Sequence, residues 1–298
     1  MAWSGALAVL GGGRYAGRLG FLGLMLAYAA LVALALATLA ADNGLSLGRN
    51  PLANLAKTFG EFAHPSFLDV WFGDPQLEYR SDDGTLLRVE DRRVVEADFL
   101  RQLAGATWTT FMIGTLGSLL GAVLALPFGV LTARNLGAPR WLGLPAKGLL
   151  DASRAIHTLV FGLVLVGIVG LGPTAGILAI AFHSMGTYGK LYAEAIESLD
   201  MSAVEAVRAV GAGPAQVFFN GVWPSVLPQF VSNHLYVWEF NIRDSTVLGL
   251  IGAGGLGLLI TEATALFQWG RLATVLLVVV ALVSLFDAAS RRIRKALL

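Results

Sequence analysis

Long apolar runs separated by shorter polar stretches dominate this sequence. Six of the runs are long enough to cross a membrane, because a helix needs about 20 residues to span the hydrocarbon core. They cover residues 19–41, 107–133, 148–171, 174–193, 222–242 and 271–289. Lipid offers an open backbone no hydrogen-bond partner, so each run is expected to be helical. The pattern predicts an all-α, polytopic membrane bundle of about six transmembrane helices.

The charged residues between the runs predict how the chain is oriented. Basic residues lie at both ends of the chain and after the second and fourth runs: Arg14, Arg18, Arg134, Arg140, Lys147, Lys190, Arg208, Arg291, Arg292, Arg294 and Lys295. The opposite loops differ, since Gly172-Pro173 has no charge and residues 42–101 have more acidic than basic residues. The positive-inside rule therefore places both termini in the cytoplasm, which agrees with an even number of spans.

Residues 42–101 are the only sizeable polar region, and they separate residues 1–41 from a core at 102–298. Pro51 to Phe62 has the pattern of a short amphipathic helix on the outer membrane surface. Leu77 to Val89 contains Asp83-Gly84, a strong hairpin-turn signal. The apolar residues around the turn partly alternate with charged ones, as in a half-buried hairpin: Leu77, Tyr79, Leu87 and Val89. This region is either a solvated loop without a role or a contact surface for an external partner.

A second apolar stretch, residues 247–259, is too short and too rich in glycine to be predicted as a span. Irregular backbone at membrane depth is tolerated only where protein buries it or where it lines a cavity. We therefore expect a re-entrant or interfacial element within the bundle.

Composition excludes several classes of protein. Hydrophobic residues make up 56% of the chain and charged residues 14%, whereas soluble domains have about 25% charged residues. Cysteine is absent and the four histidines are scattered, so neither a thiolate site nor a metal site is expected. Gly252 to Gly257 fits G-x-G-x-x-G but lacks the strand, helix and acid of a dinucleotide site, and no P-loop occurs. The chain is not expected to be an enzyme or to bind nucleic acid, and Arg291 to Lys295 is interpreted as an orientation anchor.

The polar loop after the fourth run predicts a short, isolated helix. Ser202 and Glu205 have the spacing of a capping box, Gly211 can end a helix in the left-handed conformation, and Pro214 prevents simple continuation. Two turns of helix are unstable alone in water, so this helix must lean on its own protein or on a partner. Apolar contacts at helical spacing are available from Val204, Val207 and Val210.

This loop resembles the "EAA" loop of binding-protein-dependent ABC importer permeases. Glu205-Ala206-Val207, Gly211 and Gly221-Val222-Trp223-Pro224 follow its spacing, with departures at Val207, Gly221 and Trp223. In that family the loop forms a coupling helix that sits in a groove of a cytoplasmic ATPase, and here the helix would cover 202–211. The resemblance implies that the ATPase-coupling residues are Ser202, Val204, Glu205, Ala206, Val207, Arg208, Gly211, Ala212 and Pro224.

Further runs look like the phosphonate-importer permease family over about residues 103–290. They include Arg154-Ala-Ile-His157, Gly170-Leu-Gly-Pro173, Gly189 to Glu197, Glu239 to Arg243 and Thr246 to Gly255. His157-Thr158 stands where that family usually has Pro-Glu. The resemblance implies a type I ABC importer permease (MetI-like) fold and transport of phosphonate or a related phosphorus oxyanion across the bacterial cytoplasmic membrane.

The same resemblance implies the partners. They are two cytoplasmic ATPase subunits that bind ATP and Mg, an extracytoplasmic phosphonate-type solute-binding protein, membrane lipid and a second permease copy in a homodimer. This chain itself is expected to bind no cofactor. The alternative is a stand-alone secondary transporter or channel for a small anion, although no convincing internal repeat supports it.

Charged and polar residues in or next to the predicted spans mark a candidate translocation path, because charges in lipid are costly and normally face the bundle interior. The candidates are Arg154, His157, Glu239, Arg243 and Thr246. Glu239 and Arg243 are four residues apart on one helix face and can pair. They are either a structural ion pair or, in the case of Arg243 and Arg154, a source of transient positive potential for an anion.

Overall fold

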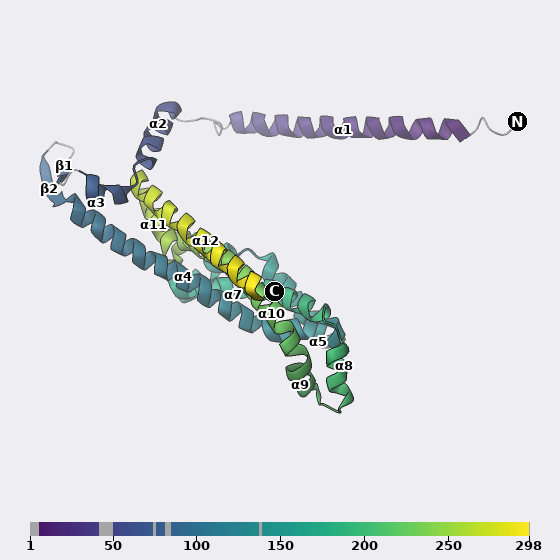
Figure 1. Ribbon diagram of the computed structural model, residues 1–298. Helices are drawn as coiled ribbons and strands as arrows, with labels where there is room; N and C mark the ends of the chain where they lie inside the picture. Colours follow the sequence, from purple (N-terminus) through teal and green to yellow (C-terminus); the bar gives the residue numbers. More distant parts are fainter. Residues whose placement is uncertain (1–5, 42–49, 74–75, 81–84, 137–138, 298) are drawn as a thin grey trace. The chain divides into compact units, whose positions relative to one another are not determined.

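The computed structural model describes residues 6–41, 50–73, 76–80, 85–136 and 139–297, and nearly all of them are helical (Figure 1). The contacts within the chain divide it into residues 1–58 and residues 59–298. The first unit contains α1 (Ala6–Ala41) and most of α2 (Pro51–Phe62). From Phe21 onward the side chains of α1 are exposed and apolar, as expected of a helix that faces lipid.

The short helix α2 has the predicted bounds and is amphipathic. Leu52, Leu55 and Phe59 are exposed at spacings of three and four residues, so they share one face of the helix. No residue of α2 is buried. The prediction of a short amphipathic helix at Pro51 to Phe62 is confirmed.

The rest of the polar region forms a turn of 3₁₀ helix, η1 (Ser66–Leu68), the short helix α3 (Asp69–Phe72) and two antiparallel strands, β1 (Gln76–Arg80) and β2 (Leu86–Asp91). The predicted hairpin is therefore confirmed, while its Asp83-Gly84 turn lies outside the described residues. The expectation of a half-buried hairpin is wrong at Leu87 and Val89, which are 69% and 48% exposed. No layer of the described residues covers this face of the two-stranded sheet.

Helices α4 (Arg92–Thr132) and α7 (Pro173–Glu197) form the most extensive helix pair in the bundle. Small residues allow membrane helices to approach closely, and α4 presents glycine to α7 along its length. A Cβ atom on Gly117 would lie 2.7 Å from the Ile180 Cβ, and one on Gly129 would lie 2.9 Å from the Tyr192 Cβ. The backbones are thus closer than any larger residue at these positions would allow.

The predicted span at 148–171 is not one helix. After a turn of 3₁₀ helix, η2 (Arg134–Leu136), the chain forms α5 (Arg140–Ala155) and α6 (Thr158–Val169), which meet at a bend of 92°. His157 has extended backbone angles and its Nδ1 accepts a hydrogen bond from the Leu159 N–H at 3.2 Å. The histidine therefore caps a new helix at the point where an apolar run alone predicted continuity.

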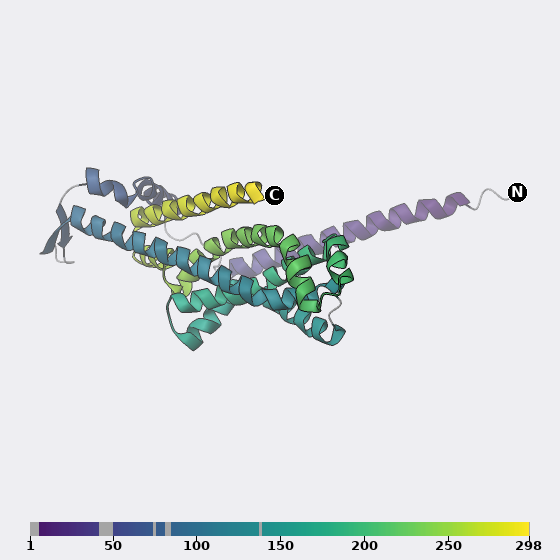
Figure 2. The ribbon, with the colours of Figure 1, turned by 60° about the horizontal axis from the view of Figure 1, so that its bottom comes forward.

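The remaining chain forms two short helices, two π-helical turns and three longer helices. These elements are α8 (Ser202–Ala209), α9 (Pro214–Val217), the π-helical turn η3 (Phe218–Val222), α10 (Trp223–Leu248), the π-helical turn η4 (Gly249–Ala253), α11 (Leu256–Ala265) and α12 (Trp269–Leu297). Helix α12 packs on α10 and α11. The hairpin lies at one end of α4, and α8 and α9 lie at the other (Figures 1 and 2).

The glycine-rich stretch at 247–259 is irregular and largely buried, as predicted. Gly252 has a φ of +97°, and the helical segment before it meets α11 at a bend of 57°. Gly249 and Gly257 pack directly, since a Cβ on Gly249 would lie 2.6 Å from the Gly257 Cα. The bend is that of a broken span or a re-entrant loop.

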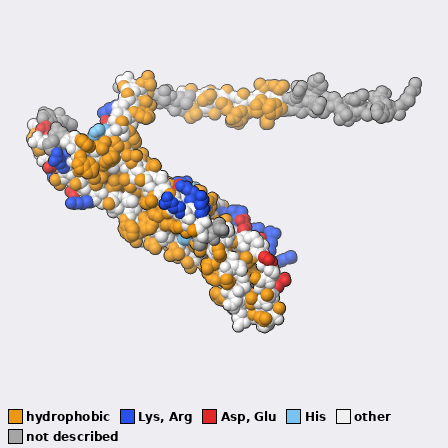
Figure 3. Space-filling model, viewed as in Figure 1, with side chains coloured by type: hydrophobic (Ala, Val, Ile, Leu, Met, Phe, Trp, Pro, Cys, Tyr) orange, Lys and Arg blue, Asp and Glu red, His pale blue; other side chains and the backbone are white. Residues whose placement is uncertain are grey.

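Three helices among the described residues are long and apolar enough to cross a membrane, or five if each bent pair counts as one span, where the sequence predicted six. The three are Phe21–Ala41, Arg92–Thr132 and Trp269–Ala296. Helix α7 covers the expected 174–193 span but is not among them, because polar residues interrupt its apolar sequence. Hydrophobic side chains cover much of the face on which α4 and α12 lie (Figure 3).

Close packing of α4 on α7 generates a stability prediction. Gly117→Val should destabilise the bundle by about 1–3 kcal/mol, because overpacking forces neighbouring atoms apart. Gly105→Val on the same helix is the matched control, since a Cβ there meets no atom within 4 Å. Thermal unfolding followed by size-exclusion chromatography in detergent should show a lower midpoint for the Gly117 variant only. Equal midpoints would contradict the proposed close approach.

Candidate functional site

Helix α8 has one buried face and one exposed face. Val204 is fully buried in a hydrophobic cluster with Ile196 and Val222, and Val207 packs partly against this cluster. Val210 is 84% exposed, so the expectation that it also makes an apolar contact is wrong within this chain. The exposed face of α8 includes Ser202, Glu205, Ala206 and Arg208. The helix therefore leans on its own bundle through two valines and leaves its other face free for a partner.

The start of α8 differs from the predicted capping box. Ser202 is the first helical residue rather than the residue before it, so its side chain does not cap the helix. Instead the Asp200 carboxylate accepts a hydrogen bond from the Ser202 N–H at 3.0 Å. This bond lowers the pKa of Asp200, so its contribution is present above the usual pKa of aspartate and is lost as the pH falls through the lowered value.

The end of α8 agrees with the sequence prediction. Gly211 has a φ of +81°, and its N–H donates to the Arg208 carbonyl oxygen at 2.9 Å. Side chains other than glycine rarely adopt this conformation. Gly211 therefore ends the helix and turns the chain toward α9.

A close contact joins α8 to the start of α10. Gly221 lies in η3 directly beneath α8, and a Cβ there would lie 3.3 Å from the Val204 Cα. The turn η3 runs into α10 and Pro224 stands in the first turn of α10, so α8 rests on the segment that leads into that helix. The departure from the family pattern at Gly221 thus has a physical reason, since an apolar side chain there would hold α8 away from the bundle.

A buried polar network joins α4, α7 and α10. The Asn241 amide donates to the Ser118 Oγ at 2.8 Å and accepts from the Ser184 Oγ at 3.0 Å. The Ser118 Oγ and the Tyr188 hydroxyl lie 2.7 Å apart, and this hydroxyl also lies 3.1 Å from the His234 Nδ1. Polar groups away from water are costly unless they are hydrogen-bonded, so this network fixes how the three helices meet.

A cavity of about 230 Å³ opens beside this network, between α7 and α10. It is lined by His183, Ser184, Thr187, Tyr236, Val237, Phe240, Asn241 and Asp244. The Thr158 hydroxyl at the start of α6 donates to the Asp244 Oδ2 at 2.8 Å. The His183 Nδ1 lies 2.8 Å from the Ile156 carbonyl oxygen, and the ring centres of His157 and His183 are 6.4 Å apart.

The five residues predicted for the translocation path do not meet in one site. His157 lies beside the cavity between α7 and α10. Arg154 lines a separate cavity of about 360 Å³ together with Lys147 and Lys190, and it forms an ion pair with Asp151 at 3.4 Å. Thr246 is buried in α10.

The expected pairing of Glu239 with Arg243 is wrong. Glu239 lies 3.5 Å from Arg294, because α12 packs on α10 and brings this arginine to it. The guanidinium of Arg243 lies instead over the Phe240 ring, 5.5 Å from its centre. The other basic residues at the end of α12 are exposed, Arg291, Arg292 and Lys295, and Lys and Arg side chains gather there in Figure 3.

A polar stripe runs along the bundle, and the sequence analysis missed it. On α7 the residues that are exposed or partly exposed recur every three or four positions: His183, Thr187, Lys190, Glu194 and Glu197. On α10 the same spacing gives the polar residues Gln229, Asn233, Tyr236 and Arg243, with the apolar Phe240 between the last two. The two helices pack together, and the Asn233 amide donates to the Leu191 carbonyl oxygen at 3.4 Å. The signal was present in the sequence as polar residues at helical spacing within and just after the apolar runs.

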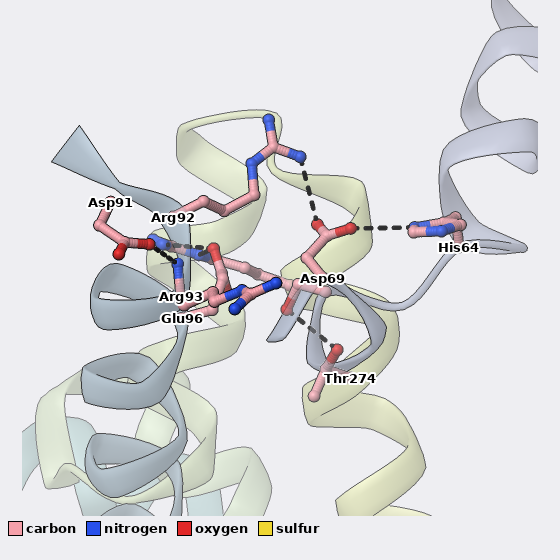
Figure 4. A network of polar contacts seen from close by, with 9 residues as sticks. His64, Asp69, Asp91, Arg92, Arg93, Glu96 and Thr274 are labelled. Atoms are coloured by element: carbon pink, nitrogen blue, oxygen red, sulfur yellow. Dashed lines mark hydrogen bonds and ion pairs between the residues drawn. The ribbon is translucent and has the colours of Figure 1, made fainter. Parts of the chain in front are cut away.

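At the opposite end of α4 a charged network holds the polar region to the bundle (Figure 4). Arg271 of α12 donates two hydrogen bonds to Glu96 of α4, at 2.9 and 3.3 Å. Asp69 lies between Arg92 at 3.8 Å and His64 at 3.5 Å. These residues line a cavity of about 430 Å³, and their contacts connect α3 to α4 and α4 to α12.

Comparison with known proteins identifies the class of this chain. Residues 125–298 match the family described as the binding-protein-dependent transport system inner membrane component. This match covers more than half of the chain, and the chain therefore belongs to that family of transport permeases. The predicted recognition is confirmed, and so is the prediction that the chain is a transport component rather than an enzyme.

Two relatives and one solved structure are similar to this chain over about two thirds of its length. The chain is 40% identical to the phosphite transport system permease protein PtxC of Stutzerimonas stutzeri, over 63% of this chain and 70% of that protein. It is 36% identical to the phosphate-import permease protein PhnE of Mycolicibacterium smegmatis, over 63% of this chain and 35% of that protein. An inward-facing MetNI methionine ABC transporter structure aligns with a TM-score of 0.61 at 24% identity, covering 67% of this chain and 98% of that one. This likeness confirms the predicted MetI-like fold.

The polar network gives a prediction about stability. Asn241→Leu should destabilise the bundle by roughly 1–3 kcal/mol, because it leaves the Ser118 and Ser184 hydroxyls buried with fewer partners. Replacing Ser118 and Ser184 by alanine in the same variant should recover much of this loss, since no buried donor then lacks its acceptor. Thermal unfolding midpoints of the single and triple variants, compared in one detergent, would measure both. A triple variant less stable than the single one would contradict the proposed role of the network.

Proposed function

We propose that this permease carries a phosphorus oxyanion of the phosphite, phosphate or phosphonate class along the polar stripe of α7 and α10. The stripe is the observation that carries the proposal. Lysine, arginine and glutamate at membrane depth are expensive when they face lipid, whereas the exposed residues of α1, α4 and α12 are mostly apolar. A face of this kind suits contact with water and a small anion.

A second copy of the chain, in a homodimer, supplies the other wall of the passage. One chain leaves the stripe open along its side, and the cavities at its two levels are only partly enclosed by α5, α7 and α10. Two copies related by a twofold axis place the same surface on each side. This arrangement removes the charged residues from lipid and encloses a path between the subunits.

Cations and donors are distributed along the stripe rather than gathered in one site. Arg243 lies at one level, and Lys190 and Arg154 lie at another. A guanidinium suits the geometry of a phosphorus oxyanion, but an importer must also release its cargo. Positive charge that is spread along the length of the passage attracts the anion without holding it tightly. Tight binding of the anion is the task of a separate receptor. The relatives that transport phosphite and phosphate support this choice of substrate.

Helix α8 couples this passage to a pair of cytoplasmic ATPase subunits, which bind ATP and Mg. Its exposed face, from Glu205 to Val210, lies in a groove of the ATPase, while Val204 and Gly221 hold it to η3 and α10. A loaded extracytoplasmic solute-binding protein docks near the hairpin at the other end of the bundle. The chain lies in the bacterial cytoplasmic membrane with both termini inside, and this chain itself binds no cofactor.

Coupling residues can be tested by association with the ATPase. Glu205→Arg and Gly211→Val should each reduce copurification of the ATPase at least about tenfold, a loss of about 1.4 kcal/mol of binding free energy. The first variant reverses a charge on the exposed face, and the second distorts the end of α8. Membrane insertion should be unchanged.

Matched controls exist for both coupling variants. Glu262→Arg reverses an exposed charge on α11, and Gly213→Val changes a glycine of the same loop that has a φ of −70°. Both controls should retain the ATPase. Normal copurification and transport by the Glu205 and Gly211 variants would show that α8 is not the coupling helix.

The proposed passage can be tested at Arg243. Arg243→Gln should lower the rate of oxyanion uptake severalfold without changing the affinity of the receptor, because the positive charge is lost and the side chain stays polar. Arg243→Lys keeps the charge and should retain most of the uptake. Uptake into proteoliposomes that contain the permease and the ATPase, with loaded receptor supplied, would measure this. An unchanged rate in the glutamine variant would show that Arg243 only packs on Phe240.

A further inference from the structure

One residue on the wall of the proposed anion passage has the wrong charge for an anion. Asp244 lines the cavity between α7 and α10, beside His183, Thr187 and Tyr236. A carboxylate repels an anion at short range, and the repulsion grows in a medium of low dielectric constant. Its place on this wall therefore calls for a chemical reason.

Asp244 is held in place but is not neutralised by a cation. Its Oδ2 accepts the Thr158 hydroxyl at 2.8 Å, which fixes the carboxylate at the junction of α6 and α10. No lysine or arginine of the described residues forms an ion pair with it within 4.0 Å, although such pairs are found for Asp151, Glu194 and Glu239. The second carboxylate oxygen is thus available to accept a hydrogen bond from whatever enters the cavity.

The substrate class can supply that hydrogen bond. Phosphorus oxyanions keep one dissociable proton close to neutral pH, as shown by the second pKa of about 6 of phosphate esters. The P–OH group of a protonated oxyanion donates a hydrogen bond to the carboxylate. A fully ionised oxyanion has no such proton, so its oxygens and the carboxylate oxygens are all acceptors and repel one another at close range. We propose that Asp244 selects the protonated form of the phosphorus oxyanion for passage. The proton stays on the substrate throughout, so no proton acceptor is required.

This inference rests on the proposed function, and it assigns a specificity-determining role at one level of the passage. The neighbouring cations attract any small anion, and Asp244 then rejects those without a proton. Its charged and titratable neighbours are His183 on α7, His157 before α6, and Tyr236 and Arg243 on α10, whereas Arg154 lines the separate cavity with Lys147 and Lys190. Because these protein groups lie beside the same cavity, the test must separate any effect of theirs from the protonation of the substrate.

Two substrates with different second pKa values provide this separation. Uptake of phosphite and of methylphosphonate, whose second proton dissociates at higher pH, is measured from pH 5.5 to 8.5 in proteoliposomes with the permease, the ATPase and saturating loaded receptor. For the unmodified protein the rate should fall by up to about tenfold per pH unit above the second pKa of each substrate. The midpoint should therefore lie at higher pH for methylphosphonate. Coinciding midpoints would mean that a protein group titrates, and they would overturn the proposal.

Variants at the site complete the test. Asp244→Asn keeps an oxygen that can accept the Thr158 hydroxyl but lacks the negative charge. Its uptake rates at low and high pH should therefore agree within about twofold, whereas the rates of the unmodified protein should differ by about tenfold. Thr158→Val keeps the charge and should retain the steep profile. Receptor affinity and ATPase activity are measured at every pH as controls. An asparagine variant with the unmodified profile would overturn the role of Asp244, whereas absence of uptake of either anion by the unmodified protein would contradict the proposed function instead.

Discussion

Polar groups between membrane helices must find partners inside the protein, and the contact of α4, α7 and α10 depends on this constraint. The glycines of α4 bring the backbone of α7 close enough for short side chains to meet across the gap. Ser118, Ser184 and Asn241 then satisfy one another without water. Removal of one partner leaves the other buried polar groups without a hydrogen bond. The network therefore specifies one arrangement of the three helices more strictly than apolar packing alone would.

The surfaces on the two sides of the α4–α7 pair suit different surroundings. The outward residues of α4 and α12 are apolar and suit lipid, while α7 and α10 present polar side chains at helical spacing. This asymmetry explains why α7 does not look like an ordinary span, since one of its faces is buried against α4 and another faces the proposed passage. A permease needs such a face, because a wholly apolar bundle offers an anion no favourable surroundings.

Charges at the two ends of the bundle have different tasks. At one end Glu96, Arg271, Asp69 and Arg92 hold α3 to the helices and thereby fix the base of the hairpin. At the other end α8 rests on η3 through Val204 and Gly221, and its charged face remains exposed. The π-helical turn η3, on which α8 rests, continues into α10, and α10 bears both Arg243 and Asp244. The proposed coupling contact and the proposed passage thus share one helix.

The sequence alone determined the helical membrane class, the short helix predicted at 202–211 with its Gly211 terminus, the hairpin and the irregular glycine-rich stretch, because these depend on local patterns of apolar, capping and turn residues. It did not determine the break at His157, the Asp200 hydrogen bond at the start of α8 or the partner of Glu239. Those depend on backbone angles and on which residues of distant helices are brought together. Arg294 is 55 residues after Glu239 in the chain, and only the packing of α12 on α10 places them 3.5 Å apart. Spacing along one helix therefore predicted that Glu239 pairs with Arg243, whereas tertiary packing pairs it with Arg294.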